Sequence, residues 1–217
     1  MNSQALIFDL DGTLLNTIED IASVTNQALD KNGFPIHPIA EYSIMVGHGL
    51  KNLVKNALPG SCNETEIDKV YKAVISEYRK TPVQKTSMYP EIPNLLNELT
   101  RLQIPMAILS NKLHEITIPI VSIILGKWKF EVVLGARNNI PKKPDPYSAI
   151  EIASTMNIPP SCCLFIGDSG TDVKTALACG MNPIGVSWGY RNIEDIKSAG
   201  ADIIVHRPLE ILNFIHI

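Results

Sequence analysis

The arrangement of apolar segments predicts an α/β protein: a doubly wound, Rossmann-like parallel sheet into which a small α-helical cap domain is inserted. An apolar run over residues 4–9 has the length and composition of a buried strand. After residue 82, short apolar or β-branched runs alternate with helical segments, which is typical of parallel strands joined by right-handed crossovers. The stretch between these two parts shows only helical periodicity. We therefore expect a core formed by residues 1–15 and 83–217 and a cap formed by residues 16–82.

The cap segment carries the start and stop signals of helices. Asn16 and Glu19 fit a capping pair at the start of the first helix, and Gly33 is expected to end that helix. Apolar side chains continue to recur at helical spacing after this point. They predict further helices over residues 38–45, 50–58 and 64–79.

The core segment alternates strands and helices in the order that a parallel sheet requires. Each predicted strand is a short apolar or β-branched run, and a helical segment separates it from the next one. The predicted strands cover residues 106–109, 131–134, 164–166, 183–186 and 202–205. The predicted helices cover residues 92–102, 113–125, 147–156, 171–179 and 193–199.

The composition narrows the classes of function. A chain of 217 residues with 45% hydrophobic and 19% charged residues fits a globular protein. Its formal charge of -3 provides no basic field, so nucleic acid is not expected as a partner. No apolar stretch approaches the ~20 residues of a membrane span, and no signal-peptide pattern opens the chain. The cysteines form no CxxC pair, so we expect free thiols and a cytoplasmic location; they are Cys62, Cys162, Cys163 and Cys179.

Polar residues that could take part in catalysis or ligand binding follow the ends of several predicted strands. In a doubly wound sheet, ligands bind outside the carboxyl ends of the strands, at the point where the strand order reverses. Residues far apart in the chain are therefore expected to meet at one site. They are Asp9 and Asp11 after the first strand, Ser110 and Asn111 after residues 106–109, Lys143 after residues 131–134, and Asp168 and Asp172 after residues 164–166.

These segments, in this order, resemble the four motifs of the haloacid-dehalogenase superfamily. The motifs read DLDGT at residues 9–13, ILSN at 108–111, KPDP at 143–146 and GDSGTD at 167–172. The resemblance covers essentially the whole chain, including the helical insert. The lysine of this family precedes Pro-x-Pro, which selects Lys143 and leaves Lys142 as a solvated neighbour.

A cluster of four carboxylates needs a cation. Two like charges ~4 Å apart repel by about 4 kcal/mol at an effective dielectric near 20. All-oxygen ligands with open positions for phosphate and water suit Mg²⁺. The resemblance implies that the metal is held by a side-chain oxygen of Asp9, the backbone carbonyl of Asp11 and the side chain of Asp168. Asp172 would then support this metal as an outer ligand or by orienting the others.

The resemblance also implies phosphoryl transfer through a covalent intermediate. Asp9 would attack phosphorus and become an aspartyl phosphate. Asp11 would protonate the departing alcohol and then activate the hydrolytic water. Ser110 and the amide of Asn111 would bind phosphoryl oxygens, while Lys143 would neutralise charge on the phosphoryl group and on the nucleophile.

The cap and Asp11 bear on the substrate. A halide leaves without a proton, so Asp11 disfavours cleavage of a carbon–halogen bond. The insert resembles the mobile cap of the phosphoglycolate-phosphatase-like group, with hinges expected near residues 14–17 and 81–85. Its loop at residues 47–51 is expected to face the catalytic end, where His48 and Lys51 would bind substrate or else lie exposed.

The sequence therefore predicts a Mg²⁺-dependent phosphatase that acts on a small phosphorylated metabolite, with 2-phosphoglycolate as the leading substrate. A β-phosphoglucomutase-like phosphosugar mutase or a pyrophosphatase would use the same core. A non-enzymatic phosphate-responsive binding protein would need no Asp11 beside a cap. Neither a membrane nor a nucleic acid is expected as a partner, and the oligomeric state is left open between monomer and homodimer.

Overall fold

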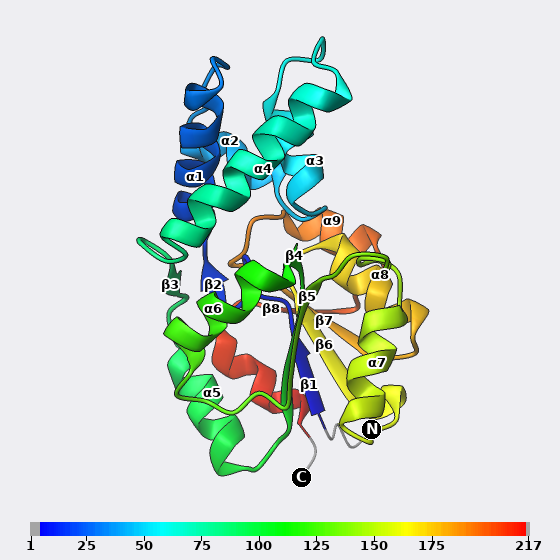
Figure 1. The fold of residues 1–217 in the computed structure, drawn as a ribbon. Helices are drawn as coiled ribbons and strands as arrows, with labels where there is room; N and C mark the ends of the chain where they lie inside the picture. The colour runs from blue at the N-terminus through cyan, green and yellow to red at the C-terminus, as the bar shows by residue number, and fades with distance from the viewer. Residues whose placement is uncertain (1–4, 216–217) are drawn as a thin grey trace.

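A parallel sheet of six strands forms the centre of the computed structural model, which describes residues 5–215 (Figure 1). The strand order is β5-β4-β1-β6-β7-β8, and all neighbours in this sheet pair in parallel. This architecture confirms the predicted doubly wound α/β core. The strands are β1 (Ala5–Phe8), β4 (Met106–Leu113), β5 (Val132–Ala136), β6 (Cys163–Gly167), β7 (Asn182–Val186) and β8 (Ile203–Val205).

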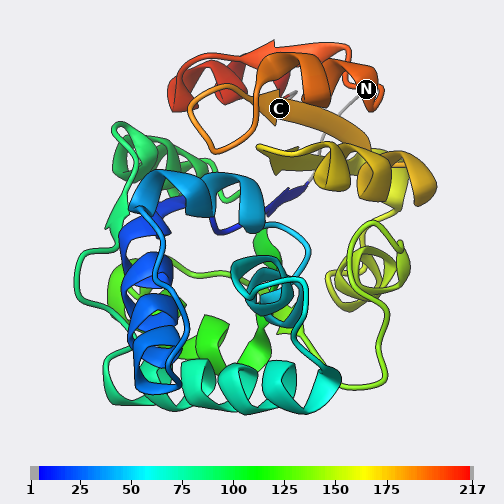
Figure 2. The same ribbon diagram turned by 90° about the horizontal axis from the view of Figure 1, so that it is seen from above.

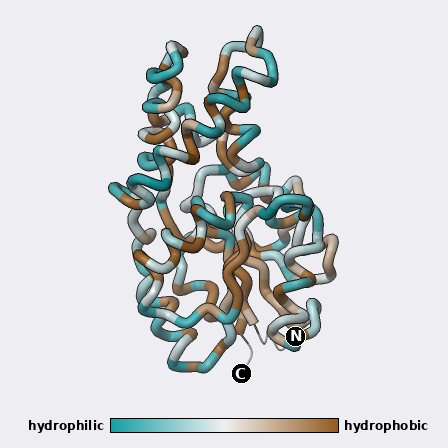
Figure 3. Tube along the Cα trace, viewed as in Figure 1, coloured by the Kyte–Doolittle hydropathy of each residue, from teal (hydrophilic) through white to brown (hydrophobic). Residues whose placement is uncertain are grey.

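Helices cover both faces of the sheet because successive side chains of a strand point to opposite sides. In β1, Leu6 and Phe8 belong to the apolar cluster that includes α5 and α6, whereas Ala5 and Ile7 belong to the cluster of α7 and α8. Figure 3 shows the hydrophobic residues concentrated along the central strands. The core helices are α5 (Ile92–Arg101), α6 (His114–Leu125), α7 (Tyr147–Thr155), α8 (Gly170–Ala178) and α9 (Ile193–Ser198), with 3₁₀ turns η1 (Pro160–Cys162) and η2 (Pro208–Phe214).

The cap consists of helices inserted between β1 and β4, and Figure 2 shows them from above. They are α1 (Ile18–Lys31), α2 (Ile39–Met45), α3 (Leu50–Ala57) and α4 (Glu64–Lys80). Gly33 follows α1 with a φ of 75°, a conformation that suits glycine, as expected of the residue that ends this helix. Asn63 and Glu66 form a capping box at the start of α4. Among the described residues, no helix combines the length and apolar character needed to cross a membrane.

The two connections between cap and core are tied to each other. Short strands β2 (Leu15–Asn16) and β3 (Ser87–Met88) pair in antiparallel fashion. The buried Asp20 carboxylate of α1 accepts backbone N–H bonds from Gln84, Lys85 and Thr86, and the Thr86 hydroxyl donates to it at 2.6 Å. Burial alone would raise the pKa of Asp20, but these donors outweigh it and lower the pKa. The predicted hinge segments thus lie at a hydrogen-bonded junction, and their motion remains a prediction.

Two local predictions were wrong. Asn16 does not cap the first helix, because it pairs with Ser87 in the β2–β3 ribbon. The N-cap is Thr17, whose side chain makes no capping bond and donates instead to Asp11. The strand predicted over residues 106–109 continues to Leu113, with a shift of register between Leu109 and Leu113. The polar residues in between were expected in a loop, but pairing with β5 keeps the segment extended.

Candidate active site

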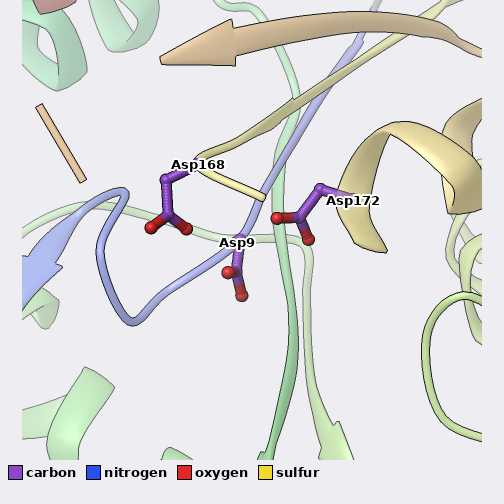
Figure 4. Close-up of side chains that lie close together, drawn as sticks. All are labelled: Asp9, Asp168 and Asp172. Carbon is purple, nitrogen blue, oxygen red and sulfur yellow. The ribbon is translucent and has the colours of Figure 1, made fainter. Parts of the chain in front are cut away.

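Three buried carboxylates meet where the strand order reverses. Asp9 follows β1 and Asp168 follows β6, and these strands are neighbours in the sheet. Asp172 lies in the first turn of α8. Each residue offers a carboxylate oxygen within 4.8 Å of the others, and Figure 4 shows Asp9 near Asp168 and Asp172. Three of the four predicted carboxylates therefore form a compact group, and Asp11 is not among them.

The electrostatics of this cluster fit a divalent cation. Burial, followed by the charge of Asp172, raises the pKa of Asp168 to about 7. Burial is also the largest influence on Asp9, whose pKa is raised well above its usual range although Lys143 opposes the shift. The carboxylates thus repel one another in a desolvated space. Hard oxygen donors at such a place are the ligands that Mg²⁺ and similar cations prefer.

Lys143 links the nucleophile candidate to the rest of the cluster. Its ammonium group lies 2.8 Å from Asp9 Oδ1 and 2.6 Å from Asp172 Oδ1, and it donates to the Leu109 carbonyl at 2.9 Å. Only 3% of its side chain is exposed. Burial alone would lower the pKa of Lys143, but the two aspartates outweigh it and raise the pKa. Lys143 therefore stays charged and holds Asp9 in place.

The side-chain amide of Asn111 is bound to backbone groups of the protein and positions Lys143. Its Oδ1 accepts the Lys143 backbone N–H at 2.9 Å, and its Nδ2 donates to the Lys143 carbonyl at 3.0 Å. The same Nδ2 donates to the carbonyl of Gly47 in the cap at 2.9 Å. Protein groups thus occupy the Asn111 side-chain amide, and the predicted contact between the amide of Asn111 and a phosphoryl oxygen stays a prediction.

Local helix chemistry places Asp172. Ser169 is the N-cap of α8, and its backbone N–H and hydroxyl both donate to Asp172 Oδ2. The second oxygen, Oδ1, accepts from Lys143. A capping box and the buried Lys143 thus share one carboxylate, with Oδ2 bound to Ser169 and Oδ1 to Lys143.

Close packing holds Asp168. Its Oδ2 accepts the backbone N–H of Tyr190 at 2.7 Å. Gly12 has a φ of 87°, and a Cβ there would lie 2.4 Å from Asp168 Oδ2. A Cβ at Gly189 would lie 2.2 Å from the Asp168 Cβ. Both positions need glycine so that the backbone can approach the carboxylate.

The Asp11 side chain belongs to a different group of polar residues. Thr17 donates its hydroxyl to Asp11 Oδ1 at 2.7 Å. The ammonium group of Lys112 lies 3.1 Å from Asp11 Oδ2. Asp11 thus stands apart from the three clustered carboxylates, as a proton-transfer group distinct from the nucleophile would. A metal contact through its backbone carbonyl remains a prediction.

Lys112 is a site residue that the sequence analysis missed. Its side chain is 8% exposed, its ammonium group lies 5.1 Å from the centre of the Tyr78 ring, and it donates weakly to the Tyr78 hydroxyl at 3.4 Å. Burial alone would lower the pKa of Lys112, but Asp11 outweighs it and raises the pKa. The available signal was the position of this lysine two residues after Ser110, close to the end of a predicted strand.

One pocket joins these groups to the cap. Ser110, which is buried, and Lys143 line it from the core. The pocket has a cavity volume of about 70 Å³, which suits a small ligand. The cap contributes an apolar wall that includes Ile21, Val46, Leu50 and Leu53. Gly47 and Gly49 also line the pocket, so the loop at residues 47–51 faces the catalytic end as predicted.

Neither His48 nor Lys51 lines this pocket, so the structure does not support their predicted role in substrate binding. Lys51 pairs with Asp68 at 2.8 Å and Glu64 at 3.3 Å on α4. The reason is helical geometry: α3 starts at Leu50, and successive residues are rotated by about 100°, so Leu50 faces the pocket and Lys51 does not. His48 is exposed and lines an adjacent surface hollow. Lys142 is exposed, as a solvated neighbour should be.

Comparison with known proteins agrees with this geometry. A profile of the haloacid dehalogenase-like hydrolases matches residues 6–186, from β1 to the end of β7. The phosphoglycolate phosphatase of Psychrobacter arcticus is 31% identical over 204 residues, covering 91% of this chain and 89% of its own length. That of Chromobacterium violaceum is 29% identical over 213 residues, covering 96% of this chain and 94% of its own.

The fold, including the cap, has close structural neighbours. A crystal structure of a Lactobacillus delbrueckii subsp. bulgaricus protein, assigned as a phosphoglycolate phosphatase, superposes with a TM-score of 0.92. It is 27% identical in sequence, and the match covers 99% of both chains. The similarity therefore extends over the cap as well as the acidic cluster.

Proposed function

We propose that this chain, which belongs to the haloacid dehalogenase-like hydrolase family, hydrolyses a small phosphate monoester with Mg²⁺ through an aspartyl-phosphate intermediate. Its relatives identify it as a phosphatase, a phosphoric monoester hydrolase. The observation that carries the finer proposal is that the two aspartate side chains have different neighbours. Asp9 belongs to the acidic cluster and contacts Lys143, whereas the Asp11 side chain belongs to a second polar group with Thr17.

In this proposal Asp9 is the nucleophile. Its Oδ1 is held by Lys143, and Ser110 lines the same pocket from the neighbouring strand. Attack of the free Asp9 oxygen on phosphorus would break the ester bond and form the acyl phosphate. Lys143 and Ser110 would interact with the negative charge of the phosphoryl group during this step.

The acidic cluster is the place for the cation. Asp9 and Asp168 would hold Mg²⁺ together with the backbone carbonyl of Asp11, with Asp172 in support. When bound, the cation offsets the repulsion between the carboxylates and the phosphate and polarises the phosphoryl oxygens.

Asp11 would transfer the protons. The leaving alkoxide needs a proton, and the water that hydrolyses the acyl phosphate must lose one. A single carboxyl group beside Asp9 can do both in turn, first as acid and then as base. Thr17 and Lys112 fix its orientation from either side.

The leading substrate is 2-phosphoglycolate. Support comes from the relatives named above, which are phosphoglycolate phosphatases. The pocket supports the same size class, because its cap side is apolar and leaves little room.

A panel of phosphate esters tests this proposal. We expect hydrolysis of 2-phosphoglycolate with Mg²⁺, loss of activity with chelator, and recovery when Mg²⁺ is restored. Asp9→Asn should lower kcat by at least about 1,000-fold, whereas the exposed Asp145→Asn should retain activity. Hydrolysis that is indifferent to metal or to Asp9→Asn would overturn the mechanism. Including β-glucose 1-phosphate and pyrophosphate in the panel separates a phosphatase from a mutase or a pyrophosphatase.

A further inference from the structure

On its cap side the pocket is lined by apolar side chains and glycines, with Tyr78 as the polar exception among the lining residues. Cap residues Leu50 and Leu53 line it together with Leu113 and Ile116 of the core. Among these apolar side chains stand the Lys112 ammonium group and the Tyr78 hydroxyl, which lie 3.4 Å apart. A few polar groups in an otherwise apolar pocket usually determine how a small ligand is oriented and which ligand is selected.

Among the three positively charged residues that line the pocket, Lys112 is the one whose other contacts leave it able to bind a ligand. Lys143 already contacts Asp9, Asp172 and the Leu109 carbonyl. Arg191 donates to carbonyl oxygens of the cap, including that of Val46. Lys112 has a single charged partner, Asp11, in the part of the chain that the structure describes, and its contact with Tyr78 is long.

We propose that Lys112, assisted by the Tyr78 hydroxyl, binds a carboxylate on the leaving group and thereby selects phosphate esters of 2-hydroxy acids. This inference rests on the proposed function and assigns the residue that sets its substrate class. It takes the place of the predicted role of Lys51 in substrate binding, because Lys51 is paired with Asp68 and does not line the pocket.

The distances suit this class of ester. Asp11, as the acid, must come within hydrogen-bond reach of the ester oxygen. The Lys112 ammonium group lies one further hydrogen-bond distance away, at 3.1 Å from Asp11 Oδ2. In an ester of a 2-hydroxy acid, the carboxylate is attached to the carbon that carries the ester oxygen. A substrate held at Asp11 therefore presents its carboxylate to Lys112.

Binding of this carboxylate would also release Asp11. Lys112 contacts both oxygens of Asp11, Oδ2 at 3.1 Å and Oδ1 at 3.3 Å, and Thr17 donates to Oδ1. When the substrate carboxylate takes over Lys112, one Asp11 oxygen becomes available to the ester oxygen. Tyr78 belongs to α4 of the cap, so this recognition needs cap and core to be in contact.

The test compares two esters that differ only in the carboxylate group: 2-phosphoglycolate and 2-hydroxyethyl phosphate, in which a hydroxymethyl group replaces it. We expect Lys112→Met to lower kcat/KM for 2-phosphoglycolate by about 30-fold or more relative to 2-hydroxyethyl phosphate, the usual effect of losing a charged hydrogen bond. Tyr78→Phe should shift the same ratio in the same direction by less. The matched control Lys51→Met should leave the ratio and both rates unchanged.

Equal losses on the two esters would overturn the inference, since Lys112 would then act only by positioning Asp11. Inhibition by glycolate gives a second readout: its inhibition constant should rise in Lys112→Met and stay the same in Lys51→Met. Circular dichroism and Tm show whether each variant folds. Failure of the proposed function would look different, because wild-type protein would then hydrolyse neither ester in a manner that depends on Asp9.

Discussion

The charged residues of this site differ in how deeply they are buried and in which groups contact them. Lys143 is almost completely desolvated, and it is tolerated because Asp9 and Asp172 lie within 2.8 Å of its ammonium group. Asp11, in contrast, is held by one hydroxyl and one ammonium group at the border of the cap. Two aspartates separated by one residue in the chain thus have different surroundings, as the proposed roles of one as nucleophile and the other as proton-transfer group require.

Asp11→Asn separates the two chemical steps. Nitrophenolate leaves without a proton, so we expect the variant still to transfer phosphate from p-nitrophenyl phosphate to Asp9. The acyl phosphate should then accumulate because no base activates water. Rapid mixing should show a burst of one nitrophenol per protein, followed by turnover at least about 100-fold slower than wild type.

Asp9→Asn is the control for that experiment, since without the nucleophile it should show no burst. If Asp11→Asn turns over nitrophenyl phosphate at the wild-type steady rate, Asp11 is not the base of the second step.

At the scale of secondary structure, several hydrogen bonds join the two connections between cap and core. One carboxylate, that of Asp20 at the start of α1, accepts hydrogen bonds from three consecutive backbone N–H groups at residues 84–86. The β2–β3 ribbon lies next to it along the chain. The start of the first cap helix and the return of the chain to the core are therefore anchored to each other, which keeps the cap in register over the pocket.

Asp20→Asn should destabilise the protein. The amide nitrogen of asparagine cannot accept the bonds that one carboxylate oxygen now accepts, and a loss of about 3 kcal/mol in unfolding free energy is expected. Because the folded pKa of Asp20 is lowered, its stabilisation is present above the unfolded pKa of about 3.9 and is lost as pH falls through the folded value.

Urea denaturation at pH 7 and pH 3 checks this expectation. The difference between wild type and Asp20→Asn should be large at pH 7 and should shrink at pH 3. The exposed Asp30→Asn should stay within about 0.5 kcal/mol of wild type. A difference between wild type and Asp20→Asn that is the same at both pH values would show that the carboxylate charge is not involved.

For the whole molecule, the pocket depends on contact between the cap and the core. The cap loop after α2 is held to the core by Arg191, which donates to the Val46 carbonyl at 2.5 Å, and by Asn111, which donates to the Gly47 carbonyl. A second connection, between Arg79 and Glu115, lies at the exposed edge. Since exposed ion pairs contribute little, we expect the first connection to matter more for closing the pocket.

Arg191→Met should lower kcat/KM for the preferred ester by about 10-fold, because one charged hydrogen bond that favours the closed arrangement is lost. Arg79→Met should change kcat/KM by less than about twofold. Steady-state kinetics of the two variants, with Tm as a check on folding, provide the comparison. Equal effects from both substitutions would contradict this assignment of the closing contact.

The sequence carried most of the information about the fold. The apolar runs and helical periodicities correspond to the observed strands and helices with small shifts at their ends, because local burial patterns reflect the face that each element presents to the core. The exceptions are Asn16 and residues 110–113. Their conformation follows from pairing with strands that lie far away in the chain.

The sequence alone also indicated that side chains following neighbouring strands would meet, since the carboxyl ends of parallel strands share one edge of the sheet. That reasoning holds for Asp9, Asp168 and Lys143. It also placed Asp11 in the acidic cluster, whereas the structure puts the Asp11 side chain with Thr17 and Lys112 instead. It could not determine what the cap contributes, because the direction of a side chain on a cap helix depends on how that helix is rotated against the core. Only the tertiary structure turned Lys51 away from the pocket and brought Tyr78 and Lys112 together inside it.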